Sequence, residues 1–165
     1  FIGTINNDDS TFMITDKVYD RAMPINIDEK ADKFDAPKTG TLELSYKHLN
    51  NLFINAKEGN KVKEELLQKL TLTDKYIIEH FRISFGNRIM KQLNTFVPVY
   101  VACGGEELAG IDYFIAKKIF RKFEQLNISF IRDELDPFIS YLNKNFGKRT
   151  MKECIAYVEK KKKSI

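Results

Sequence analysis

The chain has 165 residues, of which 43% are apolar and 30% are charged, and 27 basic residues against 23 acidic residues give a net charge of +4. This length and apolar content suffice for one domain with a buried core, and they exclude an intrinsically disordered chain. The mild net charge does not by itself indicate nucleic-acid binding, because four of the basic residues form the run Lys160 to Lys163 and the remainder is nearly balanced.

The cysteines and the apolar runs indicate in which cellular compartment we expect the chain. Cys103 and Cys154 are far apart and lack metal-ligand spacing, so we expect free thiols in the reducing cytoplasm and no metal site. The sequence contains neither a signal peptide nor an apolar run long enough to span a membrane, so we expect no membrane partner. Phe1 lies within an apolar run and is not an initiating Met, which favours a fragment of a longer protein.

The first 27 residues alternate between apolar and polar stretches. Phe1 to Ile5 is typical of a short buried strand, and Asn6 to Thr11 form a polar loop at its carboxyl end, where ligands bind in α/β sheets. Ile14 to Ala22 can make two helical turns with Arg21 near their end. Met23 to Ile27 is a second short apolar run, so the sequence predicts two strands that flank one helix.

From residue 41 onward the pattern is helical. The stretch from Asp28 to Gly40 is rich in Asp, Lys and Pro and reads as a linker, so residues 1–40 form one predicted unit. Thr41 to Leu44 is a short alternating run that can be a strand. Apolar residues then recur at helical spacing in six or seven segments, over residues 46–57, 61–70, 73–81, 84–103, 106–126, 128–146 and from 150 onward. The sequence therefore predicts a mainly α chain in which residues 41–165 form a helical bundle.

Local signals refine these helices. Pro98 lies inside the fourth segment and should kink or split it, and Asp136-Pro137 suits an N-cap followed by a first-turn proline. Thr150 and Glu153 have the spacing of a capping box at the start of the last helix. His80 has no partner visible in the sequence, so we expect it at the edge of the core.

A basic face accompanies the apolar stripe of the segment 106–126. It contains Lys117, Lys118, Arg121 and Lys122, which lie mostly opposite the apolar side chains. Such a face is usually solvated, and the alternative is contact with nucleic acid. On this alternative, with the lysine run at 160–163, the chain is a non-enzymatic helical module that binds nucleic acid or protein.

The N-terminal stretch also carries a family resemblance. Gly3-Thr4-Ile5-Asn6, followed by Asp16-Lys-Val-Tyr-Asp-Arg21-Ala22, resembles the second half of an AAA+ nucleotide-hydrolysing module, in the branch of the McrB-like motor of methylcytosine-specific restriction systems. The resemblance implies that Asn6 is the sensor-1 residue, whose amide orients the attacking water or the terminal phosphate. It implies that Arg21 is the arginine finger, which reaches the nucleotide of a neighbouring subunit. Without it, Asn6 is a loop-capping amide and Arg21 an exposed charge at a helix end.

A second match lies in the helical part. Phe85-Gly-Asn-Arg88 resembles the start of the sensor-2 helix in the lid of the same branch, and Ile111 to Ile119 resembles the next lid helix, although the following Phe120-Arg-Lys-Phe123 departs from the common Leu-Pro-Lys-Leu. The resemblance implies that Arg88 folds over the phosphates of the nucleotide bound to its own subunit. The alternative is an exposed arginine in a first helical turn, where the helix dipole disfavours a cation.

Two elements of a complete nucleotide site are absent from the sequence. It contains no Gly-x-x-x-x-Gly-Lys-[Ser/Thr] phosphate loop and no apolar strand that ends in paired acidic residues to hold Mg²⁺. The resemblance therefore implies the C-terminal part of an NTPase that supplies sensor, finger and lid, while the complete protein binds ATP or GTP with Mg²⁺, forms a homo-oligomeric ring and drives a partner such as a nuclease on DNA. We expect this chain alone to bind no nucleotide and to hydrolyse none. Residues 1–5 and 24–27 would lack their usual sheet partner, so we expect them to be frayed, paired by another chain or rearranged.

Overall fold

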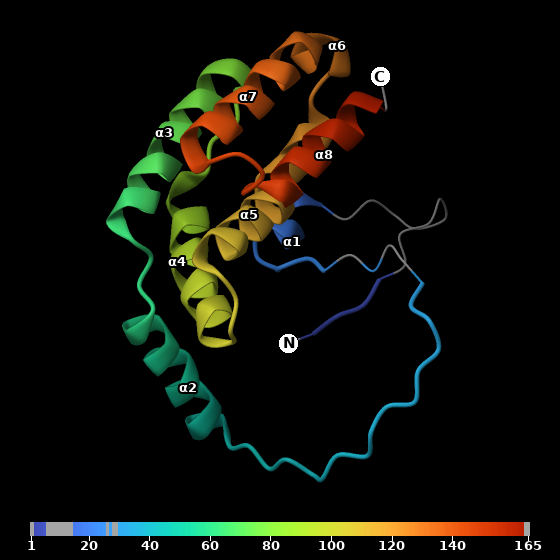
Figure 1. The fold of residues 1–165 in the computed structure, drawn as a ribbon, viewed down its shortest axis with the longest axis vertical. Helices are drawn as coiled ribbons and strands as arrows, with labels where there is room; N and C mark the ends of the chain where they lie inside the picture. The colour runs from blue at the N-terminus through green and yellow to red at the C-terminus, as the bar shows by residue number, and fades with distance from the viewer. Residues whose placement is uncertain (1, 6–14, 26, 28–29, 164–165) are drawn as a thin grey trace.

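Helices account for almost all of the regular structure. The computed structural model describes residues 2–5, 15–25, 27 and 30–163, and Figure 1 shows their arrangement. The elements in chain order are α1 (Asp16–Tyr19), α2 (Tyr46–Gly59), α3 (Glu64–Phe81), α4 (Gly86–Ala102), α5 (Glu107–Lys118), the 3₁₀ helix η1 (Phe120–Gln125), α6 (Ile128–Ile131), the 3₁₀ helix η2 (Arg132–Glu134), α7 (Leu135–Phe146) and α8 (Lys152–Lys163). The prediction of a mainly helical chain is therefore confirmed.

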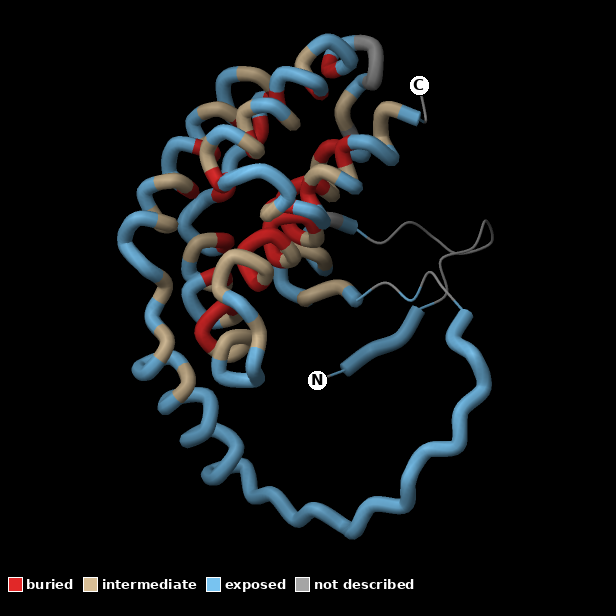
Figure 2. Tube along the Cα trace, viewed as in Figure 1, coloured by how far each residue is buried: buried red, intermediate tan, exposed pale blue. Residues whose placement is uncertain are grey.

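Helix α5 lies at the centre of the bundle. It packs against α4 on one side and against α8 on the other, while α7 also contacts α8 and α2 contacts α4. Figure 2 shows the buried residues concentrated along α5 and along the faces of α3, α4, α7 and α8 that point toward it. The outer faces of α3, α4, α7 and α8 remain exposed, as in an ordinary amphipathic bundle, whereas α2 has no buried residue.

A cluster of phenylalanine rings closes the core between α3, η1 and α7. Phe81, Phe120, Phe123 and Phe138 are fully buried. The ring centroids of Phe81 and Phe123 are 4.7 Å apart, and those of Phe120 and Phe138 are 5.4 Å apart. Burying each such side chain contributes about 1.5–3 kcal/mol, so this cluster fixes η1 and α7 against α3.

The two predicted strands do not form in the described part of residues 1–27. Residues 2–5, 24, 25 and 27 belong to no strand, and neither do residues 41–44. Their apolar side chains lie in solvent: Ile2 is 99% exposed, Ile27 90% and Leu42 83%. An extended segment forms a strand only when a neighbouring strand accepts its hydrogen bonds, and no described segment offers one. In Figure 1, the chain from residue 30 to α2 runs outside the bundle as an open arc.

The segments predicted over 61–70 and 73–81 are one helix. The hydroxyls of Thr71 and Thr73 donate to the carbonyls of Leu67 and Lys69, one turn earlier, so neither threonine caps a new helix. Helix α4 continues through Pro98 without being split there. By contrast, α5 ends at Lys118 and the chain continues as the 3₁₀ helix η1, so the long helix predicted over 106–126 is two elements.

The predicted capping box at Thr150 is wrong. The Thr150 hydroxyl lies within hydrogen-bond distance of the carbonyls of Phe146 and Gly147, at 3.0 and 2.7 Å, and thus closes the end of α7. The start of α8 is capped from another helix. The carboxylate of Asp112, on α5, accepts hydrogen bonds from the backbone N–H groups of Glu153 and Cys154 at 2.8 and 2.9 Å. These are among the N–H groups that a helix leaves unpaired at its N-terminus, where the helix dipole also favours an anion.

Candidate functional site

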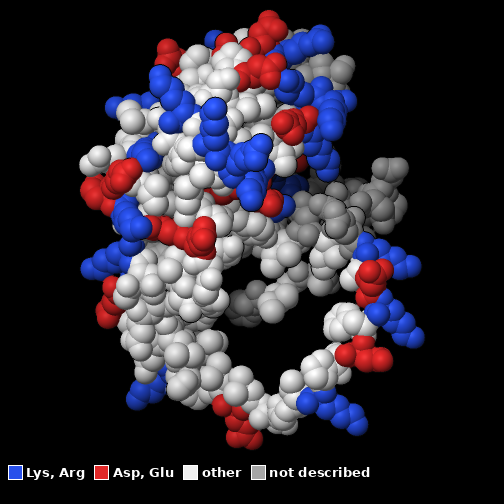
Figure 3. All heavy atoms as spheres, in the orientation of Figure 1, with Lys and Arg blue, Asp and Glu red and all other residues white. Residues whose placement is uncertain are grey.

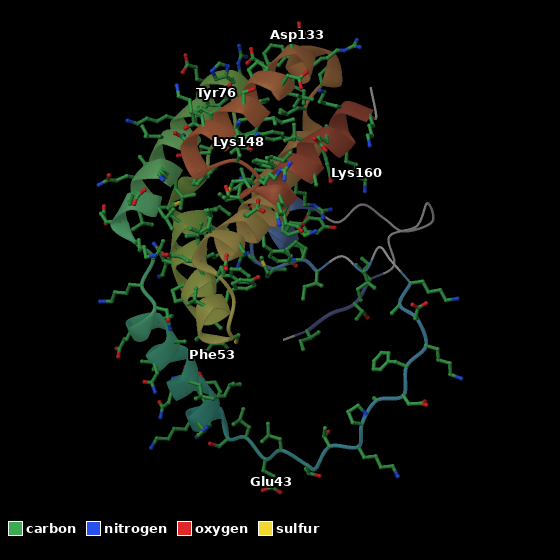
Figure 4. The ribbon with its side chains drawn as sticks, in the orientation of Figure 1. Glu43, Phe53, Tyr76, Asp133, Lys148 and Lys160 are labelled. Atoms are coloured by element: carbon green, nitrogen blue, oxygen red, sulfur yellow. The ribbon has the colours of Figure 1, made fainter. Side chains whose placement is uncertain are left out.

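A pocket of about 570 Å³ opens where the segment after α1 meets α2, α4 and α5. Its polar lining includes Arg21, Arg88, Lys91 and Lys118, and its apolar lining includes the rings of Phe53, Phe96 and Phe114. None of the lining residues is acidic within the part of the chain that the structure describes. Phe53 is labelled in Figure 4 on α2, at the lower end of the bundle. A concave, aromatic-walled space with several cations and no acid is suited to a ligand that carries both an anionic group and an apolar or aromatic part.

Two of the three predicted site residues meet in this pocket. Arg21 and Arg88 are 67 positions apart in the sequence (88 − 21), and both line it. Both residues are exposed. The third, Asn6, lies outside the described residues, so its predicted role stays a prediction.

Helix α4 supplies one wall of the pocket from a single face. Three residues that line the pocket follow Arg88 at spacings of three, four and seven positions: Lys91, Gln92 and Thr95. Arg88 lines it as well, so all four share one face of the helix. The start of this helix is fixed to α3, because the backbone N–H of Phe85 donates to the Asp74 carboxylate at 2.7 Å. Arg88 lies in the first turn of α4, where the dipole disfavours a cation. An anion in the pocket would offset that cost.

Lys118 is the residue that sequence reasoning placed wrongly. It was expected on a solvated basic face, but it is only 6% exposed. Its ammonium group donates to the carbonyls of Tyr19 and Ala22 at 2.6 and 2.7 Å. Burial lowers the pKa of Lys118, while the negative charge of Asp20 partly opposes that shift. The carbonyl of Tyr19 at the end of α1 and that of Ala22 three residues later thus receive their hydrogen bonds from α5.

Two further contacts hold the same segment. The Gln92 side-chain amide donates to the carbonyl of Asp20 at 2.9 Å. The guanidinium carbon of Arg121 lies 3.2 Å from the centroid of the Tyr19 ring, which is a cation–π contact. The short segment that carries Arg21 is therefore bound to α4, α5 and η1 at once.

The rest of the predicted basic face is divided between different environments. Lys117 lies over the ring of Tyr113, with its nitrogen 5.6 Å from the ring centroid. Lys117 and Arg121 also line a second pocket of about 440 Å³ together with Lys160 and Lys161 of α8. Glu124 and Glu153 line the same pocket and reduce its positive charge. On the face that Figure 3 shows, Lys and Arg side chains gather over the upper part of the molecule with Asp and Glu between them.

His80 belongs to a structural cluster. Its Nδ1 atom lies 2.7 Å from a carboxylate oxygen of Glu134, which joins α3 to η2. Its ring stacks on Tyr76, with centroids 4.1 Å apart, and Tyr76 in turn stacks on Tyr141 at the same distance. Tyr76 is labelled in Figure 4 on α3. The expectation that His80 lies at the edge of the core, half-buried, is confirmed.

The described residues contain no group of three or more His, Cys, Asp or Glu side chains that could hold a metal ion. None of the helices among them combines the length and the apolar character that a membrane crossing requires. Comparisons of the chain with protein-family models, with curated proteins and with solved structures found no match.

The sequence alone could have indicated Lys91 and Gln92, because they follow Arg88 by three and four residues and so share its helix face. No local pattern could have indicated Lys118. Its partners, Tyr19 and Ala22, are 99 and 96 residues away.

Proposed function

We propose that this chain is the C-terminal part of an AAA+-type NTPase of the McrB-like branch, which contributes a sensor, an arginine finger and a lid to nucleotide sites that other parts of the complete protein finish. ATP or GTP with Mg²⁺ is the substrate, and the ring drives a partner such as a nuclease acting on DNA. The single observation that carries the proposal is the pocket that Arg21 and Arg88 both line, with no acidic residue in its described lining. Guanidinium groups suit the charge that develops on a transferring phosphoryl group.

The exposed apolar residues give further support. Ile2, Ile25 and Ile27 are 75–99% exposed, and Leu42 is 83% exposed. A soluble domain rarely leaves so many large apolar side chains in water along extended backbone. In the proposed protein these segments are covered by the sheet that also carries the phosphate loop and the Mg²⁺ ligands.

The test is NTP turnover by the complete polypeptide that contains these residues. Arg21→Ala should lower kcat by about 10³-fold or more, which is the scale of an arginine finger, while nucleotide still binds. Arg88→Ala should weaken nucleotide binding and raise KM. Arg132→Ala removes an exposed arginine of η2 and serves as the matched control, with unchanged kinetics expected. Full turnover by the Arg21→Ala variant would overturn the finger assignment, and a complete polypeptide without any NTP turnover would overturn the proposed function.

A mixing experiment distinguishes whether Arg21 serves its own subunit or its neighbour. Arg21→Ala subunits keep Arg88, and Arg88→Ala subunits keep Arg21. If Arg21 acts on the neighbour's nucleotide, a mixed ring contains some sites with both arginines, so mixing should restore part of the turnover. If both arginines of one chain serve one nucleotide, as their shared pocket would permit, every site lacks one of them and mixing restores nothing.

The second pocket favours another candidate function, binding of nucleic acid through its phosphates. Four cations from two segments, Lys117 and Arg121 from one and Lys160 and Lys161 from the other, line that pocket. Phosphate contacts release counterions, so this function predicts DNA binding by the 165-residue chain that weakens steeply with salt. The Lys160→Glu/Lys161→Glu variant should bind more weakly with a shallower slope. An absence of binding at low salt would exclude this candidate.

A further inference from the structure

The backbone around Arg21 is fixed by side chains from the helical bundle. Three backbone carbonyls next to Arg21 accept hydrogen bonds from side chains of the bundle. Lys118 donates to the carbonyls of Tyr19 and Ala22, and Gln92 donates to that of Asp20. The Arg21 side chain itself is exposed and lines the pocket. A fixed backbone beneath an exposed guanidinium orients the arginine side chain toward the pocket that it lines.

Lys118, which fixes this backbone, is buried at a cost in desolvation free energy. Lysine is almost never fully buried unless its charge is paired or hydrogen-bonded. Lys118 is 6% exposed, and its two hydrogen bonds go to backbone carbonyls of the segment that carries Arg21. A methionine of similar length would fill the same space without the desolvation cost, so the hydrogen bonds account for a lysine here.

The contact through Gln92 links the two arginines. Gln92 follows Arg88 by four residues, so the two side chains share one face of α4, and both line the pocket. A displacement of α4 at Arg88 therefore moves the hydrogen-bond donor that holds Asp20, the residue directly before Arg21.

We propose that Lys118 and Gln92 are positioning residues that fix the Arg21 segment to α5 and α4, so that Arg21 moves with the helical bundle and responds to the ligand that Arg88 contacts. This inference rests on the proposed function for the identity of the ligand. The attachment of the segment itself does not, because it follows from the hydrogen bonds alone. The two parts are therefore tested separately.

The first test uses the 165-residue chain and an arginine-specific protease. Cleavage of the Arg21–Ala22 bond requires the segment to leave the bundle, so its rate reports the open population. The Lys118→Met variant loses two hydrogen bonds and should be cleaved there about tenfold faster or more. Lys75→Met, at an exposed position of α3, is the matched control and should be cleaved at the wild-type rate. Equal rates for Lys118→Met and wild type would overturn the attachment.

Gln92→Met guards against a folding defect in the Lys118 variant. Gln92 is half-buried and holds one carbonyl only, so its loss should leave the helical circular dichroism unchanged. Cleavage after Arg21 should accelerate by a smaller factor than in Lys118→Met. If Lys118→Met does not fold, an unchanged cleavage rate in Gln92→Met overturns the attachment in its place.

The second test uses turnover by the complete polypeptide. Lys118→Met should lower kcat and leave KM within about twofold, because the ammonium group of Lys118 is engaged by the carbonyls of Tyr19 and Ala22 and its loss acts by misplacing Arg21. The double variant Lys118→Met/Arg21→Ala should be no slower than Arg21→Ala, since both changes act through one side chain. Additive losses would overturn the positioning role. A complete polypeptide without turnover overturns the proposed function alone, and the protease comparison then still decides whether the segment is attached.

Discussion

Asp112 and Cys154, on the two helices α5 and α8, are joined by a reciprocal pair of contacts. The Asp112 carboxylate accepts from the backbone N–H of Cys154 at 2.9 Å, and the Cys154 thiol lies 3.4 Å from the backbone carbonyl of Asp112, to which it donates. Asp112 is 3% exposed and Cys154 is fully buried. The first turn of the last helix is thereby fixed to the centre of the bundle.

We predict that Asp112→Ala destabilises the chain by about 3 kcal/mol, because it leaves two backbone N–H groups of α8 without an acceptor and removes a charge-assisted cap. Asp112→Asn should lose less, since its amide oxygen still accepts one hydrogen bond. Urea unfolding followed by circular dichroism measures the loss. Asp133→Ala changes an exposed aspartate of η2 and should shift the midpoint little. An Asp112→Ala midpoint equal to that of the control would show that the cap contributes nothing.

Alkaline pH should unfold the chain, with Tyr157 as a main contributor. Burial, and then the negative charge of Glu124 to which its hydroxyl donates, raise the pKa of Tyr157 well above its ordinary value of 10.0. A raised pKa means that, above pH 10, the unfolded chain loses this proton while the folded chain keeps it. The stabilisation is therefore complete below pH 10 and is lost as pH rises, by up to about 1.4 kcal/mol per pH unit.

The Tyr157→Phe variant tests that assignment. Plots of unfolding free energy against pH, from pH 8 to 11, should fall less steeply for the variant than for the wild type. Burial also raises the pKa of Cys154 well above 9.0, which has the same sign, so part of the slope should remain. Burial lowers the pKa of Lys118, so that residue acts oppositely and adds stability as pH rises toward 10.5. Identical slopes for the variant and the wild type would remove Tyr157 from this account.

The ring of Tyr100 lies so close to the backbone at Gly105 and Gly110 that neither position has room for a side chain. A Cβ atom on Gly110 would lie 2.8 Å from Cδ1 of this ring, and one on Gly105 would lie 2.1 Å from its Cε1. Gly110→Ala would gain about 1 kcal/mol in helix propensity, but we expect a net loss of about 1–2 kcal/mol because the ring must move. Adding Tyr100→Leu to Gly110→Ala should recover most of that loss. In a thermal melt, strictly additive effects of the two changes would contradict the steric explanation.

Amide exchange should separate the attached segment from the extended one before it. The amides of residues 2–5 belong to no regular structure and should exchange fastest. Those of Arg21 and Ala22 donate to the carbonyl of Val18 and should exchange at intermediate rates. The amides of α5 should be slowest, since seven of the 12 residues of this helix are buried. Slower exchange in residues 2–5 than in α5 would contradict the structure of this end of the chain.

The helical part of the fold could be predicted from the sequence because its pattern is local. The apolar spacing predicted α2 almost to the residue, and the hydroxyl of Ser45 caps its start by accepting from the backbone N–H of His48 at 3.2 Å. The prediction of a capping box at Thr150 failed because a threonine hydroxyl can serve the preceding turn as readily as the following one. The local sequence does not distinguish these two uses of the hydroxyl, and the surrounding structure decides between them.

Local sequence predicts even less of the candidate site, because the site is formed by residues far apart in the chain. Arg21 and Arg88 could each be named from a motif, but nothing in either motif indicates that one pocket contains both. Lys118 fits a helical basic face by its spacing, and its burial depends on a carbonyl partner 99 residues earlier. The strands at residues 1–5 and 24–27 were predicted from composition, while a strand exists only with a neighbour, which composition does not supply.

The two cysteines differ in exposure, so their reactivity can report how often α8 detaches from the bundle. Cys103 is exposed at the end of α4, whereas Cys154 is buried beneath α5 with a thiol that resists ionisation. A thiol reagent will therefore modify the first at once and reach the second only when α8 separates from the bundle. The delay between the two modifications measures how often that helix detaches, and the measurement needs no substitution in the chain.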